Sequence, residues 1–298
     1  MRFSFWPAPS QPYQDVLELA QHVEKTGWDG IWYADHFMPN APDTTTPHQE
    51  AWTTLSALGA VVPRLRIGTL VIGNTYRHPA VLAKMAATLD HITHGRVVLG
   101  IGSGWQENEH HQYGIPFYTV AERLKRLDEA CQIIKSLFTH TTTDFDGKYY
   151  QLQHASLEPK PLQHPLPLLI GGGGEQVTLK ITAKYADEWN VWGDVSRLRQ
   201  KMEVLDAHCA DLGRNPKEIK RTAVALLFMS EDNTFLEKMR NADMQQPAII
   251  GTPSEVKDII AEYEYIGVDE LIVPDFTLGG RNQKMETLDT FIKDVAGR

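Results

Sequence analysis

The chain has 298 residues, of which 42% are hydrophobic and 22% charged, a composition typical of a soluble protein with a substantial core. Its formal net charge of −9 argues against nonspecific binding to nucleic acid or to anionic membranes, because such binding requires basic surfaces. The N-terminal run breaks at Pro7 without the apolar core of a signal peptide, and no apolar run could span a bilayer, so a cytoplasmic protein is expected.

Short apolar runs alternate with amphipathic segments of helical period along the chain. The runs predict eight strands, at residues 2–6, 29–33, 66–72, 96–101, 167–171, 187–191, 220–228 and 270–273. The helical patterns include residues 14–26, 79–94, 120–138 and 195–212, and capping boxes begin at Thr119 and Thr252. Eight strands, each followed by a helix, predict the α/β class and a (β/α)8 TIM barrel that residues 1–298 form as one domain.

Two stretches interrupt this alternation. Residues 139–166, rich in Thr, Asp, Gly and Pro, predict an inserted hairpin and loop after the fourth helix. A second insertion is expected at residues 229–250, after the seventh strand. A doubly wound open sheet is the structural alternative, but the G-x-G-x-x-G pattern that usually follows its first strand is missing here. Cys131 and Cys209 fall in phase with the apolar stripes of their helices, which predicts buried free thiols.

Small or polar residues follow four of the predicted strands. They are Asp35-His36, Gly73-Asn74, the segment 100–105 and the run Gly171–Gly174. Because the carboxyl ends of parallel strands meet at one rim, these residues are expected to form one site there. His36 is the strongest catalytic candidate, since histidine can exchange a proton near neutral pH and Asp35 stands beside it. A structural role for this histidine is the competing interpretation.

The glycine run leads directly into a helix start, where backbone amides and the helix dipole can hold a phosphate. A flexible tight turn is the alternative interpretation. The G-x-G-x-G spacing of residues 100–104 is weak evidence by itself, because close packing at a barrel rim or a ring-shaped ligand would explain it equally. Trp6, Trp105 and Trp192 each fall at or just beyond a strand end, which predicts an aromatic-walled pocket for a planar ligand.

A catalytic metal is not expected. His91 and His94 fall in the last turn of a helix, and the adjacent His110 and His111 would diverge on a helix, so neither pair supplies three ligands. The G-x-S-x-G elbow of a hydrolase is absent too, because glycine and not serine occupies the centre of residues 100–104.

Five segments taken together resemble the bacterial luciferase-like flavin monooxygenase superfamily. They are residues 33–37, 76–84, 87–91, 95–105 and 170–174. The resemblance covers nearly the whole chain and is strongest to the branch that uses the deazaflavin coenzyme F420, which carries an Asp-His pair after its second strand. It implies a TIM barrel with the cofactor ring over the C-terminal rim, and a non-prolyl cis peptide at Leu70–Val71.

The resemblance also implies a role for each matching residue. His36 would lie near the hydride-transferring carbon, and Asp35 would hydrogen-bond the polar edge of the ring. The other cofactor-binding residues it implies are Gly73 and Asn74 beneath the ring, Ser103 and Asn108 at the tail, and Gly172, Gly173, Gly174, Gln176 and Val177 around the phosphate. Independently of the resemblance, the strand-end positions of Trp6, Trp105 and Trp192 make them the expected substrate-binding residues.

One departure from the branch is informative. Its sugar-phosphate dehydrogenases have an acidic glutamate where this chain has Trp105, so that activity is not carried over. Glu107 or Glu109 could serve another proton transfer, but His36 is the better candidate. The expected function is hydride transfer between F420 and a small organic substrate, by a protein that the resemblance implies is a homodimer. The alternatives are an FMN-dependent monooxygenase of the same fold and a non-catalytic flavin-binding barrel.

Overall fold

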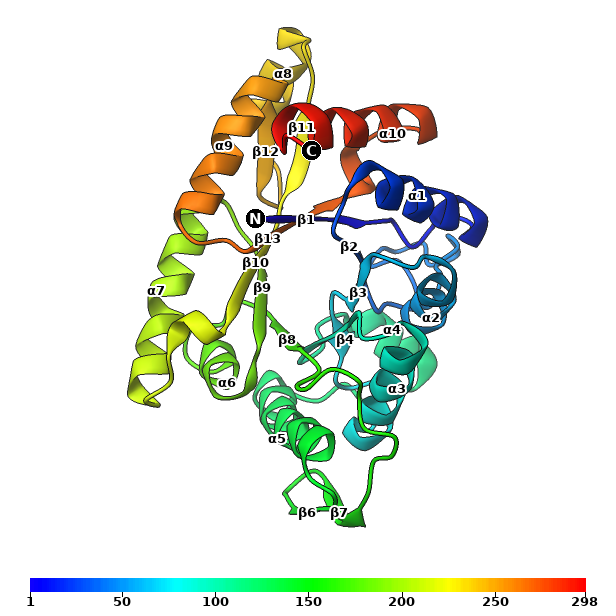
Figure 1. Ribbon diagram of the computed structural model, residues 1–298, viewed down its shortest axis with the longest axis vertical. Coiled ribbons are helices and arrows are strands. Elements are labelled where there is room, and N and C mark those ends of the chain that lie inside the picture. Colours follow the sequence, from blue (N-terminus) through cyan, green and yellow to red (C-terminus); the bar gives the residue numbers. More distant parts are fainter.

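Parallel strands close into a barrel with the helices outside it (Figure 1). The computed structural model describes residues 1–298. The barrel strands are β1 (Arg2–Trp6), β2 (Gly30–Tyr33), β3 (Arg66–Thr69) with β4 (Ile72–Gly73), β5 (Val97–Gly102), β8 (Leu168–Gly171), β9 (Glu188–Trp192), β10 (Lys220–Val224) and β13 (Glu270–Pro274). Pairing of β3 with β5 closes the ring. The predicted TIM barrel is therefore confirmed.

The helices follow the strands in the expected alternation. They are α1 (Tyr13–Thr26), α2 (Ala51–Val61), α3 (Pro79–Ile92), α4 (Glu107–Tyr113), α5 (Val120–Thr139), α6 (Thr178–Tyr185), α7 (Val195–Asp211), α8 (Asn233–Arg240), α9 (Pro253–Tyr265) and α10 (Arg281–Thr290). Both predicted capping boxes are present, at Thr119 before α5 and at Thr252 before α9, and they satisfy amides that a helix start leaves unpaired. None of these helices combines the length and the apolar character needed to cross a lipid bilayer.

Two predicted strands differ from the structure in extent. The strand expected at 66–72 is divided into β3 and β4 at the Leu70–Val71 bond, which is the expected non-prolyl cis peptide. The single strand expected at 220–228 is wrong, because β10 ends at Val224 and β11 (Leu226–Met229) pairs with β12 (Ala248–Gly251) instead of with the barrel. The apolar run continues across this break because Val224 and Leu227 are both buried, although in different sheets.

The two interrupting stretches contain short elements of their own. An antiparallel hairpin of β6 (Thr143–Asp146) and β7 (Gln151–Ala155) lies within 139–166, as the turn residues predicted. Helix α8 and β12 lie within 229–250. The hairpin projects from the barrel beyond α5 (Figure 1).

Most of the hydrophobic core lies in two large clusters that join the strands to the helices around them. Cys131 and Cys209 are buried in these clusters as free thiols, as predicted. A third, smaller cluster comes mainly from the barrel strands and includes Trp32, Val98 and Ile272, which indicates that side chains fill the barrel interior.

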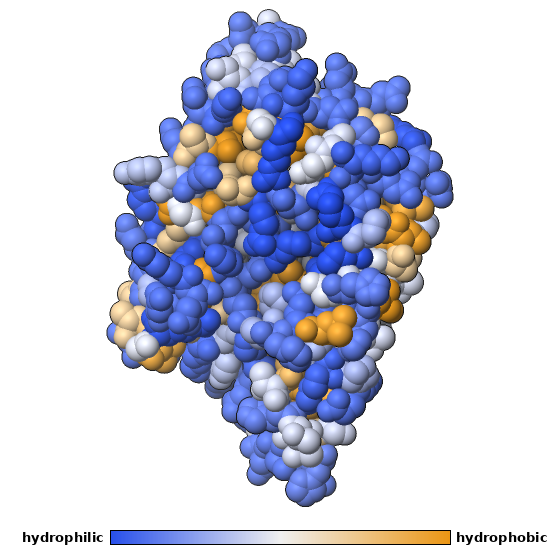
Figure 2. Space-filling view, viewed as in Figure 1, coloured by the Kyte–Doolittle hydropathy of each residue, from blue (hydrophilic) through white to orange (hydrophobic).

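A network of charges closes the N-terminal end of the barrel. Glu270 is fully buried and binds Arg66 and Arg2, the latter at 3.1 Å, and Arg66 also binds Glu188 at 2.6 Å. The indole of Trp32 and the hydroxyl of Ser4 donate to the same Glu270 oxygen. The N-terminus, where β1 begins, lies near the centre of Figure 1, and the same region is hydrophilic in Figure 2.

We expect Glu270→Ala to lower the free energy of unfolding by about 3–5 kcal/mol, because it leaves the Arg66 guanidinium without its buried partner. Urea denaturation monitored by circular dichroism measures this loss. Glu264→Ala is the matched control, since its pair with the N-terminal amine is 62% exposed on the carboxylate side and is worth about 1 kcal/mol or less. Equal losses in the two variants would contradict a structural role for the buried network.

Candidate active site

His36 lies just beyond the C-terminal end of β2 and is held by a buried carboxylate. Its Nδ1 is 2.8 Å from Oε1 of Glu109, which comes from α4, beyond the end of β5. The Glu109 side chain is fully buried, whereas the His36 side chain is 20% exposed, and its Nε2 has no protein partner. The Trp105 ring packs against the imidazole in a T-shaped arrangement, with centroids 5.3 Å apart. One nitrogen of His36 is therefore oriented and the other is free to exchange a proton.

Three donors keep Glu109 charged. Burial raises the pKa of its carboxyl, but hydrogen bonds from His36, the Phe37 amide and the Tyr76 hydroxyl outweigh that effect and bring the pKa below its ordinary value. The Phe37 amide donates to Oε2 at 2.7 Å. An ionised Glu109 accepts from the Nδ1–H tautomer of His36, and this assignment of the proton follows from the charge of its partner.

Helix α4 is clamped to the loop after β2, which fixes the distance between Glu109 and His36. Gln106 donates to the carbonyl of Met38 at 2.8 Å, and Asn108 donates to the carbonyl of Pro39 at 2.9 Å. The other amide atom of Asn108 accepts from the Glu109 backbone N–H. Asn108 thus uses both ends of its amide within the protein, and its contact with a cofactor tail stays a prediction.

Asp35 does not pair with its neighbour His36. Its carboxylate binds Arg77 through both oxygens, at 2.6 and 3.1 Å, and Arg77 also binds Glu50, the N-cap of α2, at 2.7 Å. Burial raises the pKa of Asp35, and the guanidinium of Arg77 opposes this rise. Contact between Asp35 and a cofactor ring stays a prediction, and in this structure the side chain is fully covered.

Gly73 is the last residue of β4, and Asn74 follows it. A Cβ at Gly73 would be 2.5 Å from the Tyr76 ring, so only glycine allows that ring to reach Glu109. Asn74 is buried, and its Nδ2 donates to the hydroxyl of Tyr150, the residue before β7, at 3.3 Å. Its Oδ1 is buried and has no hydrogen-bond partner. A buried orphan acceptor at the rim is a position where a ligand donor would be favourable.

The glycines at 100 and 102 are explained by the packing of the barrel rim. A Cβ at Gly100 would be 1.9 Å from the Thr69 carbonyl, and one at Gly102 would be 2.8 Å from Val71. Gly171, on the next strand, also faces Val71, at 2.9 Å. Close packing was one of the two interpretations of the G-x-G-x-G spacing, and these contacts favour it. Ser103 is partly exposed, with only a 3.5 Å contact to a neighbouring carbonyl, so its hydroxyl is available to a ligand.

The glycine run leads into a row of backbone amides that have no hydrogen-bond partner. None of the backbone N–H groups from Gly173 to Val177 donates to a protein acceptor, and α6 begins directly after them. Gly172 has φ +125°, a conformation that other residues rarely adopt. The side chain of Lys201 lies 3.6 Å from where a Cβ of Gly173 would be. Free amides, a helix start and a nearby ammonium group are the features of an anion site.

The three rim tryptophans divide into two places. Trp6 and Trp192 end β1 and β9, and their rings lie 5.8 Å apart and tilted. The buried Nε1 of Trp6 has no partner. Trp105 packs against the His36 ring and is 60% exposed. Substrate binding by these residues stays a prediction.

Two of the histidines considered as metal ligands have other contacts. His91 lies 2.8 Å from the carbonyl of Lys160, and His110 bridges Thr75 and the carbonyl of Gln106. No group of three or more His, Cys, Asp or Glu side chains has an arrangement that could hold a metal ion.

The structure therefore brings together residues that are distant in sequence. His36 and the strand-end glycines lie at the rim as predicted, and Glu109, named only as a second choice for proton transfer, anchors His36. The roles of Tyr76, Arg77 and Tyr150 were not predicted. The positions of Tyr76 and Arg77, a few residues beyond the third strand, gave a signal of the same kind as that of His36.

Fold and site together define a TIM-barrel protein with a candidate acid–base pair and a candidate anion site at the carboxyl ends of its strands. The chain belongs to the luciferase-like monooxygenase family, whose model matches residues 1–237.

Three relatives show the range of this similarity. An F420-dependent glucose-6-phosphate dehydrogenase of Amycolatopsis mediterranei is 37% identical over 58% of this chain. The matched segment spans about half the length of that relative. An FMNH(2)-dependent dimethylsulfone monooxygenase of Pseudomonas putida is 25% identical over 86% of this chain and 81% of its own. The structure of an F420-dependent secondary alcohol dehydrogenase superposes with a TM-score of 0.86, over 99% of this chain and 98% of its own, at 21% identity, which shows a shared fold.

Proposed function

We propose that this chain is an oxidoreductase that transfers a hydride between coenzyme F420 and a small organic substrate, with His36 as the acid–base residue. The observation that carries the proposal is the His36–Glu109 pair, in which a buried carboxylate holds Nδ1 and leaves Nε2 free at the rim. The named relatives support hydride chemistry with F420, and the monooxygenase relative supports FMN as the alternative. A homodimer stays a prediction from family resemblance.

The residues at the rim fit a cofactor with a polar ring and a phosphate. Asn74 Oδ1 and Trp6 Nε1 are a buried acceptor and a buried donor without partners. The amides from Gly173 to Val177 and the ammonium of Lys201 would meet the phosphate, and Ser103 lies between these two regions in strand order. Lys201 also binds Glu175 at 2.6 Å, so its charge is shared.

When bound, F420 supplies a carbon centre that gives or takes a hydride and reacts poorly with oxygen. The part of the protein is proton transfer and orientation. Oxidation of an alcohol carbon requires removal of its hydroxyl proton, and the free Nε2 of His36 is the group that accepts it. The carboxylate of Glu109 stabilises the resulting imidazolium through Nδ1, while Tyr76 and the Phe37 amide keep Glu109 in place.

Cofactor titration tests the proposal. Trp105 packs on His36 and Trp192 ends β9, so a bound ring should quench tryptophan fluorescence. We expect the Kd of F420 to be at least about tenfold lower than that of FMN, a difference of about 1.4 kcal/mol. Equal or tighter FMN binding, with oxygen consumption in the presence of reduced FMN, would identify an FMN-dependent monooxygenase instead. Failure to bind either cofactor would reject both the F420-dependent and the FMN-dependent function.

A further inference from the structure

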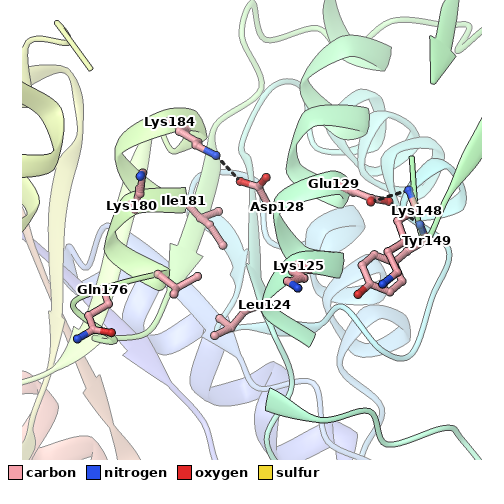
Figure 3. A pocket seen from close by; sticks show the side chains of 11 residues that line it. Leu124, Lys125, Asp128, Glu129, Lys148, Tyr149, Gln176, Lys180, Ile181 and Lys184 are labelled. Atoms are coloured by element: carbon pink, nitrogen blue, oxygen red, sulfur yellow. Dashed lines mark hydrogen bonds and ion pairs between the residues drawn. The ribbon is translucent and has the colours of Figure 1, made fainter. Parts of the chain in front are cut away.

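A pocket of about 480 Å³ lies outside the barrel, between α5, α6 and the turn that precedes β7 (Figure 3). Its size is within the usual range for small-molecule sites. Leu124 and Ile181 lie between the two helices and form part of its apolar wall (Figure 3). The remaining walls are mostly charged or polar.

The pocket collects positive charge on a chain whose net charge is −9. Four lysines and two carboxylates line it, and the lysines are Lys125, Lys148, Lys180 and Lys184. Both carboxylates are already engaged. Asp128 binds Lys184 at 2.9 Å, and Glu129 accepts the backbone amides of residues 148, 149 and 150 at 2.9 to 3.1 Å. The other three lysines form no ion pair, so their charges are uncompensated and attract an anionic ligand.

The position of the pocket indicates which anion it takes. Gln176 and Val177 line it, and they also end the row of free amides proposed to hold the cofactor phosphate. An anionic chain that leaves the phosphate in the direction away from the barrel would enter this pocket directly. Coenzyme F420 continues beyond its phosphate into a chain of glutamyl carboxylates, whereas FMN ends at its phosphate. Methylene groups alternating with carboxylates match walls that combine lysines with Leu124, Val177 and Ile181.

We propose that the pocket between α5 and α6 binds the carboxylate-bearing tail of the deazaflavin cofactor, through Lys125, Lys180 and their neighbours. This inference rests on the proposed use of F420. It gives the chain a second means of distinguishing F420 from FMN, one that does not involve the ring or His36.

The test compares two ligands on two double variants. Lys125→Ala/Lys180→Ala removes two uncompensated charges from the pocket, and Lys238→Ala/Lys257→Ala removes two exposed charges from α8 and α9, on the far side of the barrel from α5 (Figure 1). The ligands are F420 with several glutamyl residues and the deazaflavin riboside that lacks phosphate and tail. Fluorescence titration measures each Kd at low and high salt, and thermal melting checks that each variant folds.

We expect the pocket variant to bind F420 about tenfold more weakly than the parent, since each exposed ion pair contributes modestly. This difference should shrink at high salt, and Lys125→Arg/Lys180→Arg should retain the parental affinity. The riboside should bind all variants equally, and the control variant should bind F420 as the parent does. Unchanged F420 affinity in the pocket variant would overturn this inference and leave the proposed function intact. Absence of F420 binding by the parent protein would overturn both.

Discussion

Replacing His36 by alanine should lower turnover by about 10²–10⁴-fold, the usual contribution of a positioned acid or base. The imidazole has a free Nε2 at the rim, and no other side chain contacts Glu109 with an exchangeable nitrogen. Cofactor affinity should change far less, because the phosphate site lies beyond β8, on the other side of β5. A substrate is first found by screening alcohols and related compounds for a change in F420 absorbance, and steady-state kinetics then measure the loss.

Two further variants separate proton transfer from a structural effect. His140→Ala changes an exposed histidine at the end of α5 and should turn over at the parental rate. Glu109→Gln keeps the shape of the anchor but removes its charge, so it should lower turnover about tenfold or more, because the imidazolium loses its partner. A His36→Ala enzyme that turns over at the parental rate would show that another group transfers the proton.

Adjacency in sequence was a poor guide to which side chains would meet at the rim. Asp35 and His36 are neighbours, but their side chains bind different partners. Asp35 binds Arg77, which also binds Glu50, while His36 binds Glu109, which is 73 residues away. Hydrophobic periodicity carries no information about such pairs. The barrel itself was predictable, because each strand and helix is marked by local patterns and the capping boxes are local as well.

The glycines at the rim show a second limit of structure prediction from sequence alone. Those at 100 and 102 belong to a G-x-G-x-G spacing that a ring-shaped ligand would also explain, yet the atoms that would meet their Cβ positions belong to Thr69 and Val71. Which partner a glycine accommodates depends on the neighbouring strand and is invisible in its own segment. The extent of β10 could not be predicted for a similar reason, because the barrel core and the β11–β12 pair bury equally apolar residues.

At the glycine run after β8, an experiment can determine whether rim glycines serve ligand binding or only chain packing. Gly173→Val should abolish detectable cofactor binding, or weaken it by about 100-fold or more, if the amides from Gly173 onward hold the phosphate. Already the first added carbon would lie 3.1 Å from Val191 and 3.6 Å from Lys201, so the larger side chain displaces either the loop or the lysine. Gly173 itself does not have a positive φ, which falls on Gly172, so the strain of a left-handed backbone does not arise at residue 173.

Isothermal titration with F420 measures the effect, and circular dichroism with thermal melting establishes that the variant is folded. Gly280→Val is the matched control, because a Cβ at Gly280 meets nothing within 4 Å and its φ is not positive. The riboside without phosphate provides a second comparison, since it should lose little affinity when the phosphate site is blocked. If the folded Gly173→Val protein binds F420 as tightly as the parent does, the free amides are only those of a turn, and the phosphate must be held elsewhere on the rim.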